Sequence, residues 1–370
     1  MRIGFFLPGL HRVRRGAEIA FESIAQELGK IENVEVTLFG SGYPKNNTSY
    51  SFVHVGNIER EKFERWPSIK PLLRNERIYE ELTFIPGLAQ KYNPHNFDIT
   101  IACSYPYINW FLMSRGGKKR PSHVFVTQNG DNPIRLNNYE WRFFSCDAVV
   151  CTNLEYLNSA KRKWPCKVIT NGVDLKRFFP GQQDRDKFDL PRNVPLALIV
   201  SALVPSKRIL QGIRAAAQID GLHLVVCGDG PEREKVKALG AELMPGRFFY
   251  KKLSYEEMPD IYRAADIFIH MSLDEPFGNV YIEALATGLP VVAHDREVSR
   301  WILEDTAVLV DTTETSDVEY GILQALKMTS HSDILKRRSL VERRYSWEKI
   351  GKDYYEFLSE IINRNTSTSN

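Results

Sequence analysis

The sequence predicts an α/β protein with two doubly wound parallel sheets, each in a domain of its own. The length of 370 residues suits two domains of similar size better than one. In both halves, short apolar runs alternate with longer helical patterns, which indicates parallel strands joined by crossover helices. Residues 179–195, which are rich in Pro, Gly and charge, interrupt this alternation and indicate a linker.

The first half contains apolar runs with little alternation between apolar and polar residues. This pattern is typical of strands that are buried on both faces of a parallel sheet. An amphipathic helix is expected at 17–28, directly after the first run. The expected strands are 3–7, 34–39, 99–103, 123–127, 148–151 and 167–170.

The second half repeats the arrangement and forms another complete α/β unit. Because ligands of doubly wound sheets bind at the carboxyl ends of the strands, we expect the site in a cleft between two facing domains. The expected strands are 196–203, 223–227, 248–250, 267–271, 291–293 and 307–310. The expected helices lie near 208–218, 232–243, 255–265, 280–287, 315–328 and 346–363.

Composition excludes several classes of protein. The five cysteines are odd in number and lack C-x-x-C spacing, which argues against a disulfide framework or structural zinc and fits a reducing compartment. Residues 1–175 carry about 23 Lys and Arg against about 17 Asp and Glu, so this half suits an acidic acceptor, an anionic membrane surface or simply solvent. No basic stripe or motif for nucleic-acid binding is present.

The sequence also lacks apolar segments for membrane insertion. The apolar run near the N-terminus is too short for a signal peptide, and no run approaches the length of about 20 residues needed to span a bilayer. We expect a cytoplasmic protein, with a peripheral contact of the N-terminal domain at the inner membrane face as the alternative.

Residues 274–290, DEPFGNVYIEALATGLP, carry the strongest functional signal. They follow an apolar run, turn through Pro276 and Gly278, and then become a helix. The backbone N–H groups and the dipole of that helix N-terminus favour a diphosphate. Two carboxylates are suited to hydroxyl groups beside it, Glu275 to a sugar and Glu283 to a ribose diol. The backbone donors are expected at Phe277, Gly278, Asn279 and Val280.

This segment resembles the signature of the retaining GT-B glycosyltransferases of family 4, which include glycogen synthase and bacterial mannosyltransferases. In that family, two glutamates separated by seven residues bracket a nucleotide-sugar donor. The resemblance implies two Rossmann-like domains, 1–175 on the acceptor side and 196–345 on the donor side, joined by a linker at 176–195. It also implies that the final helix, 346–370, crosses back to the first domain before a frayed tail.

The resemblance assigns further residues in the second half. Residues 201–207, SALVPSK, resemble the family's first donor-domain turn, in which a lysine contacts the donor phosphates, so Lys207 inherits that role. The family usually has an arginine where this chain has Ala202, and Arg208 is the candidate to replace its charge. Residues 228–231, GDGP, resemble a structural turn of the same domain.

The first half matches the family more loosely. Gly16 corresponds to a glycine loop that reaches the donor phosphate and the acceptor, although the family's usual double glycine is Arg15-Gly16 here. His11, Arg12, Arg14 and Arg15 either line the acceptor side or form an exposed basic loop. The family's sugar-binding histidine is absent near 127–131, where Asn129 and Asp131 are the replacements for sugar contacts.

The expected reaction is a metal-independent, retaining transfer of a hexosyl group from a UDP- or GDP-linked sugar to a glycan, lipid-linked or small-molecule acceptor. No cofactor is expected besides this donor substrate, and Asp184 and Asp186 are interpreted as solvated charges rather than metal ligands. Two other classes stay open: an inactive sugar-nucleotide-binding subunit, and a sugar-nucleotide epimerase or phosphorylase of similar architecture. A polysaccharide-biosynthesis role is an expectation from the family alone.

Overall fold

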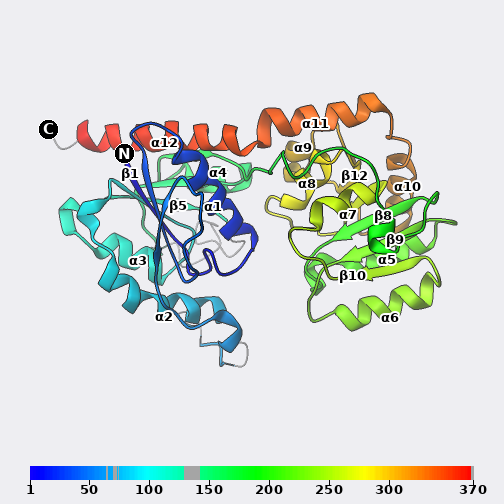
Figure 1. Ribbon diagram of the computed structural model, residues 1–370, viewed down its shortest axis with the longest axis horizontal. Helices are drawn as coiled ribbons and strands as arrows, with labels where there is room; N and C mark the ends of the chain where they lie inside the picture. The colour runs from blue at the N-terminus through cyan, green and yellow to red at the C-terminus, as the bar shows by residue number, and fades with distance from the viewer. Residues whose placement is uncertain (64–65, 70–72, 74, 129–141, 368–370) are drawn as a thin grey trace. The chain divides into compact units, whose positions relative to one another are not determined.

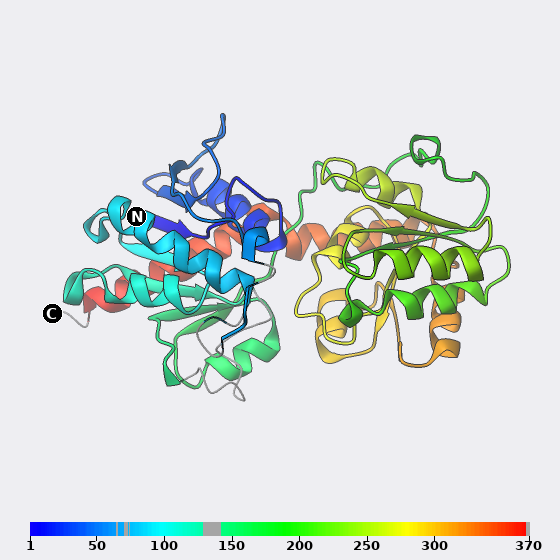
Figure 2. The same cartoon turned by 90° about the horizontal axis from the view of Figure 1, so that it is seen from below.

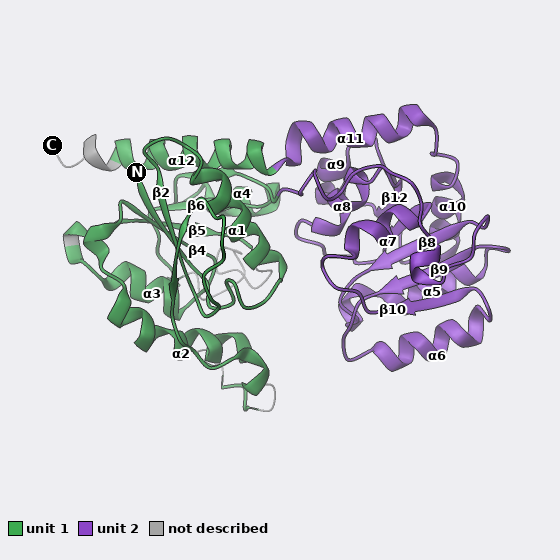
Figure 3. Cartoon of the chain, viewed as in Figure 1, with its two compact units in different colours: residues 1–171, 347–370 green, residues 172–346 purple. Residues whose placement is uncertain are grey.

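The computed structural model describes the chain except for residues 64–65, 70–72, 74, 129–141 and 368–370. The chain divides into two compact units (Figure 3). Unit 1 comprises residues 1–171 and 347–370, and unit 2 comprises residues 172–346. The segment 176–195, expected as a linker, therefore belongs to unit 2.

Unit 1 contains a seven-stranded parallel sheet with the order β3-β2-β1-β4-β5-β6-β7. This order reverses between β1 and β4, as in a doubly wound fold. The strands are β1 (Arg2–Phe6), β2 (Glu35–Gly40), β3 (Ser51–His54), β4 (Ile99–Ala102), β5 (Ser122–Val126), β6 (Ala148–Cys151) and β7 (Cys166–Val168).

Helices cover both faces of this sheet because successive strand residues point to opposite faces. Ile3 and Phe5 pack in a core with α1 and α12, whereas Phe6 packs with α2 and α3 on the other face. Helix α12 reaches this core with residues that recur on one helical face, and it contacts α1 (Figures 1 and 2). The helices are α1 (Gly16–Leu28), α2 (Glu76–Lys91), α3 (Tyr107–Ser114), α4 (Leu154–Ala160) and α12 (Trp347–Ser367).

Unit 2 contains a six-stranded parallel sheet with the order β10-β9-β8-β11-β12-β13, the arrangement found in Rossmann folds. Its strands are buried on both faces, as the apolar runs predict. The strands are β8 (Leu196–Val200), β9 (His223–Cys227), β10 (Phe248–Lys251), β11 (Ile267–His270), β12 (Val291–His294) and β13 (Val308–Val310).

The helices of unit 2 likewise form two layers. Helices α5, α6 and α10 pack on one face of the sheet, and α7, α8, α9 and α11 pack on the other. They are α5 (Ile209–Ala217), α6 (Arg233–Leu243), α7 (Met258–Ala264), α8 (Asn279–Ala286), α9 (Glu297–Leu303), α10 (Thr315–Ala325) and α11 (His331–Tyr345).

The fold class expected from the sequence is confirmed, with several differences in the elements. The sequence analysis gave no range for β3 or for the helices α2, α3, α4, α9 and α11. The expected frayed tail from residue 363 is wrong for most of its length, since α12 continues to Ser367.

Candidate functional site

Two predicted site residues meet where the strand order of unit 2 reverses. Lys207 ends a 3-10 turn after β8, and Glu275 lies in the loop after the neighbouring β11. The Lys207 Nζ donates to Glu275 Oε2 at 2.5 Å, although 68 residues separate the two in sequence. This is the position at which open α/β sheets bind ligands, because the loops on either side diverge there.

Glu275 is held by a second donor, His270, the last residue of β11. The His270 Nε2 lies 3.0 Å from the same Oε2 atom, and the imidazole is only 3% exposed. Burial by itself would raise the pKa of Glu275, but the hydrogen bonds and charges of His270 and Lys207 outweigh it and lower the pKa to about 2. The carboxylate is therefore ionised throughout the physiological range.

The N-terminus of α8 lies directly after Glu275. Its N-cap is Gly278, with φ of 78°, and no side chain caps this helix among the described residues. A Cβ at Gly278 would lie 2.7 Å from the Tyr281 ring and 2.9 Å from Glu275 Cγ, so glycine is needed here for both conformation and space. A helix N-terminus without a capping side chain offers backbone donors and a positive dipole end to an anion.

The other residues predicted at this helix start divide into two groups. Phe277 is buried in the core and packs against Tyr345 at 5.9 Å between ring centroids, so only its backbone can serve a ligand. Asn279 and Val280 begin α8 and are partly exposed. The expected strand–turn–helix setting of the segment is thus present.

Glu283 lies one turn further along α8. Its Oε2 accepts a hydrogen bond of 2.9 Å from the Tyr262 hydroxyl of α7. Burial raises the pKa of Glu283 to about 7, more than the Tyr262 hydrogen bond and the charge of Arg177 lower it.

Arg208 adjoins Lys207 but its guanidinium points elsewhere. Its Nη2 donates to the Thr312 carbonyl oxygen at 3.0 Å, after β13, and its backbone is left-handed with φ of 54°. Its Nε is buried and has no hydrogen-bond partner among the described residues. Ala202, where the family usually has an arginine, is exposed. Arg208 therefore adjoins Lys207 in sequence, but its guanidinium is directed at Thr312 and not at Glu275.

The predicted residues of the N-terminal loop lie in unit 1. Gly16 is the first residue of α1, and Arg15 is its N-cap. The Arg15 Nη2 donates to Glu61 at 2.7 Å, and Arg12 forms an ion pair with the buried Glu80. These two arginines are therefore paired within unit 1, whereas Arg14 of the same loop is exposed.

Asn129 and Asp131, which are expected to contact the sugar after β5, lie outside the described residues. Just before them, the amide groups of Gln128 and Asn171 exchange two hydrogen bonds, at 2.6 and 3.1 Å. This pair ties the end of β5 to the loop after β7.

Sequence reasoning missed His270, Tyr262 and Arg296. Arg296 donates to Asp274 at 2.8 Å, next to Glu275. Only His270 had a recognisable signal, a polar residue at the carboxyl end of a buried apolar run. Tyr262 and Arg296 come from other elements, and nothing in their local sequence marks them.

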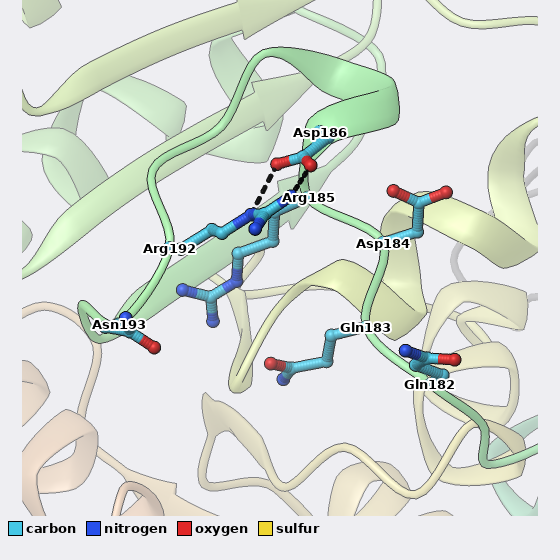
Figure 4. A pocket seen from close by; sticks show the side chains of 7 residues that line it. All are labelled: Gln182, Gln183, Asp184, Arg185, Asp186, Arg192 and Asn193. Atoms are coloured by element: carbon cyan, nitrogen blue, oxygen red, sulfur yellow. Dashed lines mark hydrogen bonds and ion pairs between the residues drawn. The ribbon is translucent and has the colours of Figure 1, made fainter.

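A hollow of about 450 Å³ lies elsewhere in unit 2, among residues 182–193 (Figure 4). Asp186 there pairs with Arg192, whereas Arg185 is buried and donates to Asp266, just before β11, so it is not part of a solvated charge cluster. Asp266 also accepts a hydrogen bond from the backbone N–H of Leu196, at the amino end of β8. This hollow therefore lies at the amino ends of the strands, whereas Glu275 follows the carboxyl end of β11. Across the described residues, no three His, Cys, Asp or Glu side chains gather to hold a metal ion.

None of the helices in the described part of the chain is both long enough and apolar enough to cross a lipid bilayer.

The fold is that of known glycosyltransferases. The chain is similar to sucrose-phosphate synthase from Thermosynechococcus elongatus, with a TM-score of 0.78, 18% identity and coverage of 98% of this chain and 99% of that one. It is also similar to Anabaena HepE in complex with UDP-glucose, with a TM-score of 0.73, 18% identity and coverage of 97% and 100%. The architecture is therefore GT-B, with two Rossmann-like units.

Sequence relatives agree with this architecture. The lipopolysaccharide core biosynthesis glycosyltransferase LpsE of Rhizobium meliloti (strain 1021) is 29% identical over 63% of this chain and 69% of its own length. The alpha-monoglucosyldiacylglycerol synthase of Streptococcus pneumoniae (strain ATCC BAA-255 / R6) is 29% identical over 59% of this chain and 53% of its own length. The model of the family described as glycosyl transferases group 1 matches residues 181–346, and the second unit of the chain belongs to that family.

Proposed function

We propose that the chain transfers a hexosyl group from a UDP- or GDP-linked sugar to a hydroxyl-bearing acceptor, with retention of configuration. One observation carries the proposal: Lys207 and Glu275 meet at the sheet reversal beside the N-terminus of α8. A cation and helix donors suit a leaving diphosphate, and a fixed carboxylate suits a sugar hydroxyl.

The roles of the side chains follow from their charges. Lys207 and the α8 N-terminus stabilise the negative charge that develops on the departing diphosphate. Glu275 orients the sugar, and Glu283 binds the ribose diol. The acceptor attacks the face from which the diphosphate leaves and gives its proton to a phosphate oxygen. No metal ion is assigned a role in this proposal.

The acceptor is proposed to be a glycan, a lipid-linked sugar or a small molecule, bound by unit 1 through the loop that contains Gly16. The activity of LpsE and the UDP-glucose bound by HepE support this class of reaction. A peripheral membrane contact and a cytoplasmic location are parts of the same proposal.

The first test is a thermal-shift series of the wild-type chain with UDP, GDP and ADP. We expect one of the first two to raise the melting temperature, and Lys207→Met to remove most of that shift. The matched control is Lys187→Met, because Lys187 pairs with Asp260 away from the site. If none of the nucleotides produced a shift, the donor site would be wrong.

The second test follows the reaction itself. NMR of the product made from the identified donor should show the donor's anomeric configuration, and inversion would contradict retention. Donor incubated without acceptor should keep its sugar unchanged, whereas an epimerase would alter it. Complete loss of turnover in excess chelator would contradict a metal-independent reaction.

A further inference from the structure

Two donors converge on a single oxygen atom of Glu275. Lys207 Nζ lies 2.5 Å and His270 Nε2 lies 3.0 Å from Oε2. The three side chains are largely shielded from solvent, with exposed fractions of 24% for Lys207, 13% for Glu275 and 3% for His270. Because both donors meet Oε2, Oε1 is the oxygen available to a ligand hydroxyl.

The two donors differ in their freedom to move. His270 belongs to a central strand, and its ring packs edge-to-face on the buried Tyr281 at 5.0 Å between centroids. Lys207 ends a short turn, and its four-carbon side chain has many more rotamers. Of the two, the lysine is therefore the one that can leave Glu275 without disturbing the sheet.

A bound diphosphate would compete for that lysine. Its charge exceeds that of one carboxylate, and Lys207 is the flexible cation of the loop after β8, whereas the guanidinium of Arg208 is held at the Thr312 carbonyl oxygen. If Lys207 turned to the phosphates, Glu275 would lose its ion pair while remaining largely buried. A largely buried carboxylate without a donor is costly and would swing away or take up a proton.

We propose that His270 is a positioning residue that keeps Glu275 in place while Lys207 moves from Glu275 to the donor diphosphate. His270 Nε2 retains Oε2, so Oε1 stays directed at a hydroxyl of the transferred sugar. Lys207 then contacts the diphosphate directly, whereas His270 acts only through Glu275. This inference rests on the proposed function and adds a division of labour between the two donors.

The division predicts two effects of removing His270. His270→Phe should weaken the affinity for UDP or GDP several-fold, because Lys207 would then leave Glu275 largely buried and without a donor. The same variant should lower kcat for the nucleotide sugar by about 10-fold or more, which is the effect expected for loss of one charge-assisted hydrogen bond. His270→Gln places an N–H donor near the former Nε2 and should recover much of kcat.

Calorimetric affinities for the nucleoside diphosphate and steady-state kcat and KM for the donor measure both effects. The matched control is His223→Gln, because His223 begins β9 and so lies at the amino ends of the strands, whereas His270 lies at a carboxyl end. An unchanged UDP or GDP affinity in His270→Phe, or an unchanged kcat, would overturn the proposal. If the wild-type chain bound neither nucleotide, the proposed function would fail first, and the two failures are thereby distinguished.

A double-mutant cycle separates positioning from folding. If His270 acts through Glu275, then His270→Gln and His270→Phe should have little further effect on kcat in a Glu275→Gln background. Additive losses would show that His270 supports the unit independently of Glu275 and would overturn its assigned role. If His270→Phe folds poorly, the cycle with His270→Leu, which also lacks an N–H donor, decides the matter.

Discussion

The two sheets share a reversal of strand order, but they place charge there in opposite ways. In unit 2, a partly exposed lysine meets a partly exposed carboxylate, and a helix without a capping side chain begins beside them. In unit 1, Arg12 and Arg60 converge on Glu80, which is only 2% exposed, and Arg15 pairs with Glu61. The charges of unit 2 can be shared with a ligand, whereas those of unit 1 already hold elements of the unit together.

This contrast changes how the excess of Lys and Arg in the first half of the sequence is interpreted. An excess of Lys and Arg suggests an attraction to acidic acceptors or to anionic membranes. The ion pairs instead connect the loop after β1 with α2 and the short helix at Arg60–Phe63. Net charge in a stretch of sequence therefore does not identify which cations remain available to a partner.

The largest expected effect comes from the cation of unit 2. Lys207→Met should lower kcat/KM for the donor by about 10²- to 10³-fold, the usual result of deleting one preorganised transition-state donor. Lys187→Met, remote from Glu275, should retain wild-type activity. Steady-state kinetics with the identified nucleotide sugar measure this, and comparable losses in both variants would contradict the assignment.

An arginine of unit 1 should behave as a structural residue instead. Arg12→Met leaves the buried Glu80 with only Arg60, and we expect the free energy of unfolding to fall by about 3 kcal/mol, the low end for a broken buried ion pair. Denaturant unfolding measures this change, with the exposed Arg14→Met as the control. Unchanged stability together with a large rise in acceptor KM would show that Arg12 binds acceptor.

Much of this architecture could be predicted because burial leaves a local record in sequence. Strands of a parallel sheet read as apolar runs, so nearly all of them were recognised. Two elements that were not recognised have weak local signals. The strand β3 is four residues long, and the helix α11 is dominated by charged residues. The site was predicted where a strand, a glycine turn and a helix start coincide in one segment.

The remaining features depend on pairs that are remote in sequence. Glu80 lies 68 residues from Arg12, and Lys207 lies 68 residues from Glu275. Local composition cannot show that the first pair is buried and structural whereas the second is accessible. His270 had a local signal, a polar residue at the end of an apolar run, but it was not singled out because strand propensity alone explains that run.

The buried Glu81 of α2 makes the stability of unit 1 depend on pH. Burial raises the pKa of Glu81 to about 8, although Arg77 opposes this, with its Nε 3.8 Å away. Between the unfolded pKa of 4.5 and about 8, the folded state binds a proton that the unfolded state lacks, so stability falls as pH rises. The slope is at most about 1.4 kcal/mol per pH unit.

Glu81→Gln should flatten that decline. The free energy of unfolding, measured in denaturant from pH 5 to 9, should become less pH-dependent and should exceed the wild-type value above pH 8. Glu32→Gln, at an exposed position, should keep the wild-type profile. An unaltered slope in Glu81→Gln would mean that the carboxyl group is hydrated or paired in solution.

Substitutions at two glycines of unit 2 test how closely the surrounding residues pack around Glu275. Gly278 and Gly246 both have positive φ, of 78° and 73°, but a methyl group at Gly278 would meet Glu275 and Tyr281, whereas one at Gly246 would meet open space. Alanine at either position should cost about 1 kcal/mol of stability for the left-handed backbone. Gly278→Ala should in addition displace Glu275 and lower kcat several-fold, while Gly246→Ala should keep kcat. Equal kcat in the two variants would show that Glu275 tolerates displacement, and its fixed position would then not be what distinguishes unit 2 from unit 1.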